Sequence, residues 1–294
     1  MSDVTAEELM AVTASRLLAD HKVVFAGVGM PLLASAVARH RQAPHLTIVL
    51  EGGIIGTTLL PGKLPISTNE MRAAYGAQML TDITDIFLYA QRGYFDYGFL
   101  GAAQVDMYGN INTSVIGSME RPRVRLPGSG GANDIISLCN EVLIVTQHEP
   151  RRFVERVDFI TSPGYLSGGD SRARAGLACG RLGAVVTDLA LLDFEPGSRR
   201  MRLRGLQAGV TVAQVREQTG FDLLVGDDIE ELVPPSAEEL AIYRELRDGP
   251  AAAGTERPGS ERPGTERPGS ERDAAAETAV GAGERADRVP AGPP

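Results

Sequence analysis

The sequence has few cysteines and no long apolar run, and both shortages restrict what the protein can be. Cys139 and Cys179 lie outside any C-x-x-C pattern, which favours two small buried apolar side chains over a metal or redox pair. Few cysteines without such a pattern are typical of cytosolic proteins. No apolar run reaches the roughly 18 residues of a membrane span, and no basic segment with an apolar core precedes the first helix pattern. We therefore expect a soluble, cytoplasmic protein.

Positive charge is also in short supply. The chain carries 29 Lys and Arg residues against 38 Asp and Glu residues, a formal net charge of −9. Nucleic acids and anionic membranes attract basic proteins, so we expect neither as a partner. A local basic pocket for a phosphorylated substrate is still compatible with this balance.

Several signatures of catalysis and cofactor binding are missing. No G-x-S-x-G nucleophile elbow and no G-x-x-x-x-G-K-[ST] phosphate loop occurs. Gly27-Val28-Gly29 follows a strand pattern and precedes a helix pattern, but Leu32 holds the third glycine position of a dinucleotide fingerprint, so NAD binding is not favoured. None of the histidines has a metal-ligand spacing, and we expect no metal site. The histidines are His21, His40, His45 and His148.

The end of the chain is almost free of large apolar residues. From Asp248 onward Pro, Gly, Ala, Glu and Arg dominate, and a Thr/Ser-Glu-Arg-Pro-Gly unit repeats between Thr255 and Asp273. Such a segment cannot bury enough apolar surface to offset the entropy lost on ordering. We predict one large domain over residues 1–247 and a disordered Pro/Gly/Glu/Arg-rich repeat tail over residues 248–294. An inert tail is favoured over a partner-docking or phosphorylated segment.

Strand and helix patterns alternate through most of the predicted domain. We expect strands at residues 22–26, 47–50, 97–100, 141–146, 158–161, 184–188 and 201–203. We expect helices at residues 5–20, 32–41, 69–80, 81–91, 134–140, 211–219 and 237–247. Thr5 and Glu8 form a capping-box pair at the first helix, and Ser236 is the expected cap of the last. This alternation predicts an α/β fold with an open, mostly parallel sheet flanked by helices.

The most informative stretch contains an acidic residue at the end of a strand. Thr47–Leu50 has the apolar, β-branched composition of a buried parallel strand, and Glu51 follows it directly. Ligands of open α/β sheets bind outside the carboxyl ends of the strands. Gly52 and Gly53 come next, and we interpret them as giving a substrate close access to the backbone. Glu51 is therefore placed like a reacting group.

A second informative stretch is the glycine-rich loop at residues 126–134. Gly128, Gly130 and Gly131 lie within four residues that also include Ser129, directly before a helix pattern. Such a loop presents several backbone N–H groups in one direction, which suits a phosphate or an oxyanion. The residues alone indicate a carboxylate nucleophile or base combined with an oxyanion site, and they do not decide between these roles.

Polar residues between 104 and 112 are further candidates. Gln104 and Asp106 are within possible reach of a ligand, but the Tyr108-Gly109-Asn110 turn favours turn capping for Asp106, Asn110 and Asn112.

Taken in order, these motifs resemble the class I coenzyme A transferases, most closely the β subunit of glutaconate CoA-transferase. The resemblance runs from about residue 7 to about residue 225 and implies the open α/β fold of the CoA-transferase superfamily. The tail has no counterpart in it. The motifs concerned are Gly27–Pro31, Val49–Gly53, Gly101–Asn112, Gly128–Asn133, Gln147–Glu149, Arg151–Phe153 and Thr161–Gly164.

The resemblance implies a ping-pong transfer of CoA between carboxylic acids, through a glutamyl-CoA thioester. Glu51 matches the family's nucleophilic glutamate. Gly130, Gly131 and Ala132 match the segment whose backbone amides stabilise the oxyanion and contact CoA, and Gln104 is a further candidate for this site. The expected substrates are an acyl-CoA and a carboxylic acid, with no permanently bound cofactor. The family's second, α-type subunit is the expected partner, in a hetero-oligomer.

Two alternatives stay open. The same scaffold serves hydrolases that open a steroid-derived ring of a CoA thioester, but their β-type chains lack the glutamate, so Glu51 favours the transferase. A non-catalytic scaffold subunit with a satisfied Glu51 is the other alternative. Gly52 stands where the glutaconate enzyme has serine, which leaves dicarboxylic, 3-oxo and steroid-derived acids open as substrates. Arg151 and Arg152 are equally good candidates for the CoA phosphates.

Overall fold

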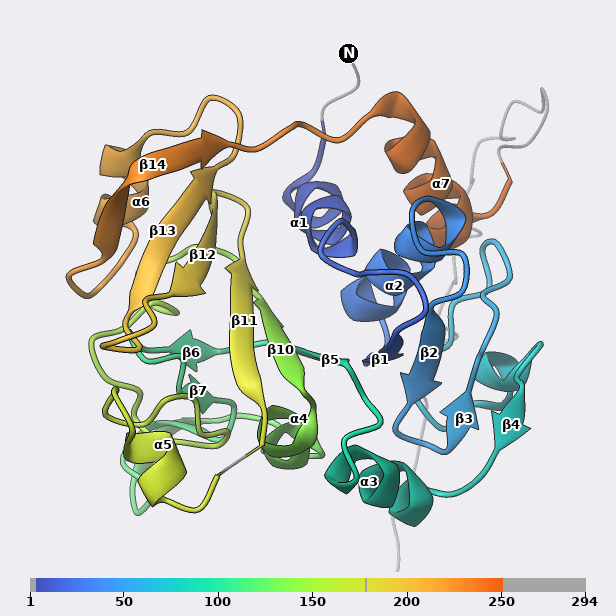
Figure 1. Ribbon diagram of the computed structural model, residues 1–294, viewed down its shortest axis with the longest axis horizontal. Helices are drawn as coiled ribbons and strands as arrows, with labels where there is room; N and C mark the ends of the chain where they lie inside the picture. Colours follow the sequence, from blue (N-terminus) through green and yellow to red (C-terminus); the bar gives the residue numbers. More distant parts are fainter. Residues whose placement is uncertain (1–3, 178, 251–294) are drawn as a thin grey trace, which may run out of the picture. The chain divides into compact units, whose positions relative to one another are not determined.

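The computed structural model describes residues 4–177 and 179–250 (Figure 1). These residues form a ten-stranded mixed sheet with helices on both faces, together with two small two-stranded sheets. The last helix ends at Asp248, and residues 251–294 of the expected tail lie outside the described residues. No helix in the described part is both long and apolar enough to cross a membrane.

The helical elements are α1 (Ala6–Ser15), α2 (Met30–His40), the 3₁₀ helix η1 (Met71–Ala74), α3 (Ile83–Gln91), α4 (Ala132–Leu138), α5 (Ser171–Arg174), α6 (Val212–Glu217) and α7 (Ala237–Asp248). The large sheet contains β1 (Val23–Phe25), β2 (Thr47–Leu50), β3 (Ile54–Ile55), β4 (Met79–Leu80), β5 (Tyr97–Leu100), β10 (Glu141–Val145), β11 (Arg181–Val186), β12 (Ala190–Phe194), β13 (Met201–Leu206) and β14 (Leu224–Glu231). The small sheets pair β6 (Gln104–Val105) with β7 (Ile111–Asn112) and β8 (Val115–Gly117) with β9 (Pro122–Arg125).

The centre of the large sheet is parallel. Its strand order is β14-β13-β12-β11-β10-β5-β1-β2-β3-β4, and the five strands from β11 to β2 all run in one direction. Antiparallel pairing is confined to the flanks, at β11–β12–β13 and at β2–β3–β4, while β14 returns to parallel pairing. The predicted open, mostly parallel α/β sheet is confirmed.

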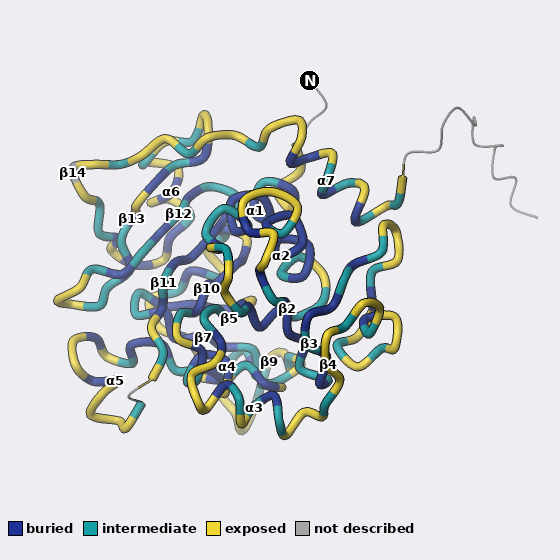
Figure 2. Tube along the Cα trace, turned by 45° about the vertical axis from the view of Figure 1, so that its right-hand side comes forward, coloured by how far each residue is buried: buried dark blue, intermediate teal, exposed yellow. Residues whose placement is uncertain are grey.

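The sheet separates two apolar cores. Successive strand residues point to opposite faces, so Ile48 and Leu50 pack under α1, α2 and α7, while Val49 packs on the other side with α3 and α4. Figure 1 shows α1, α2 and α7 grouped together, apart from α3 and α4. In Figure 2 the central strands are buried along most of their length, as expected for a parallel sheet covered on both faces.

Three helices begin with the capping box that their sequences encode. Thr5 and Glu8 at α1 satisfy each other's backbone N–H groups, as predicted. The predicted cap of α7, Ser236, does the same with Glu239. Thr211 does the same with Gln214 at α6. Each cap contributes about 1 kcal/mol of helix stability.

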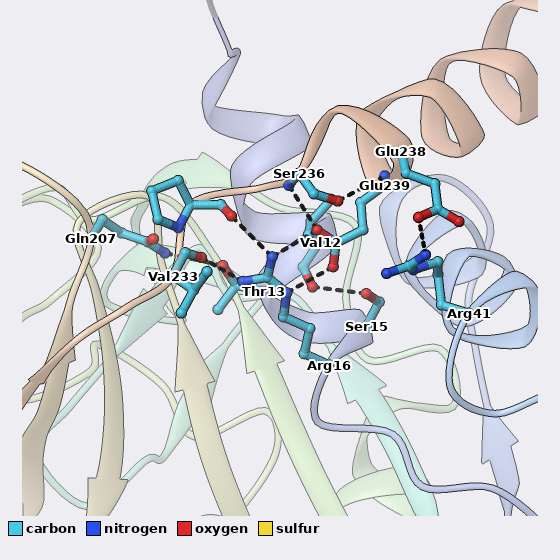
Figure 3. A network of polar contacts seen from close by, with 11 residues as sticks. Val12, Thr13, Ser15, Arg16, Arg41, Gln207, Val233, Ser236, Glu238 and Glu239 are labelled. Atoms are coloured by element: carbon cyan, nitrogen blue, oxygen red, sulfur yellow. Dashed lines mark hydrogen bonds and ion pairs between the residues drawn. The ribbon is translucent and has the colours of Figure 1, made fainter.

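Ion pairs join the last helix to the first two. Arg16 binds Glu239 at 2.7 Å and also donates to the carbonyl groups of Val233 and Pro234, while Arg41 pairs with Glu238 (Figure 3). Burial alone would raise the pKa of Glu239, but hydrogen bonds from Arg16 and from its own helix cap lower it to about 2.

A second buried carboxylate strengthens the same junction. Arg244 of α7 donates to both oxygens of Glu8 in α1, at 2.6 and 3.1 Å. These hydrogen bonds lower the pKa of Glu8 to about 2, although its side chain is only 2% exposed. We call the pairs Arg16–Glu239 and Arg244–Glu8 the α1–α7 clasp.

Some sequence expectations were wrong. Residues 69–80 are not a helix: η1 is short, Gly76 turns the chain with φ +64°, and β4 pairs with β3 at the edge of the sheet. Residues 158–161 are not a strand, because Asp158 bonds the Gln104 side chain through both its N–H and its carboxylate. The first helix ends at Ser15, followed by tight turns to Leu18. Strands β12 and β14 were not predicted.

Candidate active site

Glu51 lies at the carboxyl end of β2, where the sequence predicted it, and its side chain is half-buried. Within residues 4–177 and 179–250 its carboxylate accepts no hydrogen bond and forms no ion pair. The backbone of Gly131 lies against it: a Cβ atom on Gly131 would be 2.9 Å from Glu51 Oε1 and 2.7 Å from Phe87 Cζ. The fold therefore brings the glutamate and the glycine-rich loop, which are distant in sequence, into contact.

The loop before α4, whose Gly131 lies against this carboxylate, contains backbone N–H groups without an acceptor in the described part of the chain. Gly128 and Gly130 have positive φ angles of +99° and +47°, and Gly131 is the N-cap of α4. The N–H of Ala132 already donates to the carbonyl of Ser129 at 2.9 Å. In the described part of the chain the N–H groups of Gly130 and Gly131 donate to nothing. Two of the three amides singled out in the sequence are thus available.

The glycines after Glu51 serve packing, not the substrate access inferred from the sequence. A Cβ atom on Gly52 would lie 2.4 Å from the carbonyl oxygen of Thr68, and one on Gly53 would lie 2.1 Å from that of Thr81. Gly53 also has φ +97°. Both positions require glycine because two loops of the same chain press against the strand end.

Other glycines on this edge do face open space. A Cβ atom on Gly27 or Gly29, just after β1, would meet nothing within 4 Å, and one on Gly101, just after β5, would only reach a carbonyl oxygen at 4.0 Å. The strand order reverses between β1 and β5: β2 lies on one side of β1, and β5 lies on the other. Ligands of open α/β sheets bind at such a point.

A cavity of about 330 Å³ opens at the same edge. Arg152 lines it, is anchored by a 2.7 Å bond to the carbonyl of Ala102 and lies 3.7 Å from a carboxylate oxygen of Glu149. Arg151 pairs with the same Glu149 but lies exposed on the surface. The structure thus separates two arginines that the sequence left equivalent. The cavity is also lined by Glu7, Met10, Met30, Gly101, Ala102, Val145, Thr146 and Gln147.

Gln104 does not touch Glu51 but belongs to a buried polar network. Its amide nitrogen donates to Asp158 at 3.1 Å, and its oxygen accepts from the Asn112 side chain at 2.7 Å. The side chain is 6% exposed. The nearby turn is capped by Asp106, which accepts from the N–H groups of Tyr108 and Asn110, so the capping role expected for Asp106 is confirmed.

This network continues to the glycine-rich loop through Thr161, whose role the sequence did not indicate. Its hydroxyl contacts Asn112 Oδ1 at 3.5 Å and accepts from the N–H of Thr113 at 2.9 Å. Thr113 in turn donates to the carbonyl of Gly128 at 2.8 Å, and the carbonyl of Thr161 accepts from Asn133 at 3.1 Å. Thr161 thus holds both ends of the loop, whereas Phe87 contacts its middle.

His148 and the cysteines are not placed for catalysis. His148 is buried, its ring nitrogens lie 3.1 Å from Thr187 Oγ1 and 2.9 Å from Thr219 Oγ1, and burial lowers its pKa to about 4. Cys139 is buried as expected, which raises its pKa to about 12. Cys179 is exposed in the turn before β11, so its predicted burial was wrong.

Comparison with known proteins agrees with this geometry. The coenzyme A transferase family model matches residues 7–218. The β subunit of 3-oxoadipate CoA-transferase from Pseudomonas knackmussii is 41% identical over 86% of this chain and 97% of that protein. The β subunit of glutaconate CoA-transferase from Acidaminococcus fermentans is 35% identical over 84% of this chain and 94% of that protein.

A solved structure supports the same assignment. The crystal structure of glutaconate coenzyme A-transferase from Acidaminococcus fermentans superposes with a TM-score of 0.78 and 31% identity, over 84% of this chain and 96% of that one. This chain therefore resembles an enzyme that transfers a chemical group. It combines an open α/β sheet with a glutamate at a strand end and a glycine-rich loop that faces the glutamate. The chain belongs to the coenzyme A transferase family, and these two sequence relatives are the β subunits of such enzymes.

Proposed function

We propose that this chain is the nucleophile-bearing β subunit of a CoA-transferase and that Glu51 is the nucleophile. The observation that carries the proposal is the position of the Glu51 carboxylate: half-buried, without a hydrogen-bond or ion-pair partner among the described residues, and directly against Gly131. A carboxylate held for structure would be expected to have partners. A carboxylate that acts as a nucleophile needs an oxygen atom that no partner blocks.

The reaction would conserve the thioester bond energy in four steps. A Glu51 oxygen attacks the carbonyl carbon of the acyl-CoA, the C–S bond breaks, and a mixed anhydride forms as CoA thiolate leaves. The thiolate then attacks the Glu51 carbonyl carbon and releases the first carboxylate, which leaves a glutamyl-CoA thioester. The acceptor carboxylate repeats both steps in reverse and regenerates Glu51. No water is consumed.

The N–H groups of Gly130 and Gly131 fit the oxyanion of each tetrahedral intermediate. They donate to nothing else in the described part of the chain, and Gly131 lies against the Glu51 carboxylate, whose carbonyl carbon is attacked in the second step. Removing one such donor typically costs about 10²–10³-fold in kcat. Thr161, Thr113 and Asn133 would keep these donors in place.

A second, α-type subunit would complete the site. The relatives are named as one of two different subunits, and the segment next to Glu51 exposes large apolar side chains that a partner would cover. Ile66 is 86% exposed and Met71 is 76% exposed. Their segment is anchored at the site, because Thr68 and Thr81 press on Gly52 and Gly53.

Dicarboxylic acids are the proposed substrate class. Glutaconate and 3-oxoadipate, for which the relatives are named, both carry a second carboxylate. Arg152 is the cationic side chain that lines the cavity at the carboxyl ends of β5 and β10, and it would suit such a group.

The test is chemical trapping of the complex with its α-type partner. The complex is incubated with glutaryl-CoA or 3-oxoadipyl-CoA and treated with borohydride, which reduces a glutamyl thioester to an alcohol. We expect a lighter Glu51 peptide, loss of activity, and no such product from Glu51→Gln. Glu155→Gln, which alters an exposed acid, is the matched control and should be trapped like the unmodified chain.

Turnover of acyl-CoA without trapping of Glu51 would show that Glu51 is not the nucleophile. An unmodified Glu51 in a complex that consumes acyl-CoA with incorporation of ¹⁸O from water would indicate a hydrolase. Full activity of Glu51→Gln would show that this chain serves as a scaffold.

A further inference from the structure

Two turns at the amino ends of the parallel strands bring an aspartate and two histidines together. Asp20 and His21 precede β1, and His45 precedes β2. The two strands are parallel neighbours in which Val23 pairs with Thr47, so the turns that lead into them lie side by side. One ligand atom from each of the three side chains lies within 4.8 Å of the others. The sequence did not indicate this cluster, because His45 is distant in sequence from Asp20 and His21 and comes from a separate turn.

The two histidine side chains both approach one carboxylate oxygen of Asp20. Oδ2 of Asp20 lies 2.9 Å from Nδ1 of His45 and 3.5 Å from Nε2 of His21. The other oxygen of Asp20 accepts the backbone N–H of His45 at 2.6 Å, which fixes the carboxylate. The imidazole rings are stacked, with centroids 4.4 Å apart and planes 7° from parallel. One nitrogen of each ring therefore lies near the same carboxylate oxygen. Because the two ring planes are nearly parallel, one of the exposed rings would have to rotate for both in-plane lone pairs to point at a single ion.

We propose that Asp20, His21 and His45 form a binding site for a divalent transition-metal ion, with Zn²⁺ as the reference ion. Zinc takes imidazole nitrogen and carboxylate oxygen at about 2.0–2.2 Å, so ligand atoms around one ion are about 3–4 Å apart. The distances from Asp20 Oδ2 to the two nitrogens fall close to this range without an ion. The donor set, two imidazoles and one carboxylate, suits Zn²⁺, Ni²⁺ or Cu²⁺ better than Mg²⁺ or Ca²⁺.

Protonation and solvent access fit this assignment. A neutral histidine binds a metal through one nitrogen and keeps its proton on the other. Here His45 would bind through Nδ1, releasing the proton that this nitrogen donates to Asp20 Oδ2 in the metal-free structure, and His21 would bind through Nε2. The other ring nitrogen of each histidine would keep its proton. The two side chains are 63% and 75% exposed, which leaves room for water to complete the coordination. Lys22, the next residue after His21, forms an ion pair with Asp96 and therefore does not compete with the histidines for the Asp20 carboxylate.

The site lies at the edge opposite Glu51, so its role would be structural. An ion held by both turns would join the chain before β1 to the chain before β2. Binding to the folded state alone raises stability by an amount that grows with ligand concentration relative to the dissociation constant. The backbone of His21 makes a useful probe: its φ of +57° is a conformation that glycine adopts freely.

The test is a Zn²⁺ titration of the full chain without tags, in competition with a chromogenic chelator. It uses a Cys179→Ser background, because that exposed thiol could itself bind zinc. We expect one ion per chain, and a dissociation constant raised about tenfold or more by His21→Gly or by His45→Gln. His40→Gln, at an exposed histidine outside the cluster, is the matched control and should bind like the parent.

A second measurement guards against a folding effect. Saturating Zn²⁺ should raise the melting temperature of the parent and of His40→Gln but not of His21→Gly, whose metal-free melting temperature should equal or exceed that of the parent. Co²⁺ in place of Zn²⁺ should give visible absorption without a thiolate charge-transfer band. The proposal is wrong if His21→Gly and His45→Gln bind Zn²⁺ as tightly as the parent, or if the parent binds none at 1:1 stoichiometry.

Discussion

Replacing Gly131 by alanine tests the contact on which the proposed mechanism depends. The backbone of Gly131 has φ −80° and ψ 2°, which alanine adopts without strain. The added methyl group would lie 2.9 Å from Glu51 Oε1 and 2.7 Å from Phe87 Cζ. The substitution therefore perturbs two side chains and leaves the backbone conformation intact.

The size of the effect follows from these distances. Ordinary contact begins near 3.4 Å, so the carboxylate must retreat by about half an ångström and the Phe87 ring must also give way. A 1 Å misplacement of a reacting group costs up to about 10²-fold, so we expect kcat to fall about 10- to 100-fold with little change in KM for the acyl-CoA. Overpacking of this kind costs about 1–3 kcal/mol of unfolding free energy.

The assay measures steady-state CoA transfer by the complex with its α-type partner, together with urea unfolding of the chain. Gly226→Ala is the control for a glycine-to-alanine change, because its Cβ atom would meet nothing within 4 Å. A double variant, Gly131→Ala with Phe87→Leu, removes the ring on the other side of the methyl group. We expect it to recover part of the lost kcat, which a double-mutant cycle would measure as coupling.

Two results would refute this reasoning. Unchanged kcat in Gly131→Ala would show that the Glu51–Gly131 contact does not control the reacting carboxylate. An equal loss of kcat in the single and the double variant would show that the methyl group acts by blocking substrate and not by displacing Glu51.

Three further predictions concern the loop, the clasp and a buried histidine. Thr161→Val leaves the N–H of Thr113 without an acceptor and should cost about 1–3 kcal/mol of unfolding free energy and lower kcat, while Thr161→Ser should restore both in the same assays. The folded pKa of Glu8, about 2, lies below its ordinary 4.5, so its ion pair with Arg244 stabilises the protein above pH 4.5 and is lost as the pH falls towards 2. Glu8→Gln should therefore lose about 3 kcal/mol at pH 7, seen by urea unfolding, and little at pH 2. His148 has a folded pKa of about 4 against an ordinary 6.5, so protonation favours the unfolded chain and stability should fall between pH 6.5 and 4; His148→Asn should flatten this part of the curve.

The central strands were predictable because their signal is local. Thr47–Leu50 and Tyr97–Leu100 were placed to the residue, since buried parallel strands are continuous apolar runs that end in glycine or polar residues. The edge strands β3 and β4 were not, because two residues carry no periodicity and their pairing is decided by a partner distant in sequence. The helix expected at residues 69–80 failed for that reason.

The candidate site was predictable in its parts but not in its assembly. Glu51 and the glycine-rich loop stood out because each sits at the end of a regular element. Their contact through Gly131, the anchoring of the loop by Thr161, and the packing role of Gly52 depend on side chains that meet only in the folded chain. No spacing rule connects Asp20 with His45 either, although the parallel pairing of β1 and β2 makes their turns neighbours.

The α1–α7 clasp also determines when the domain can finish folding. Arg244 and Glu8 are 236 positions apart, and α7 closes the apolar core over α1 with Tyr243 and Leu246. Contacts of such long sequence separation form slowly, because a long loop must close before they contribute. A chain still being synthesised would leave the part of this core that Tyr243 and Leu246 cover exposed until its last helix is complete. Until then that apolar surface would be available to chaperones.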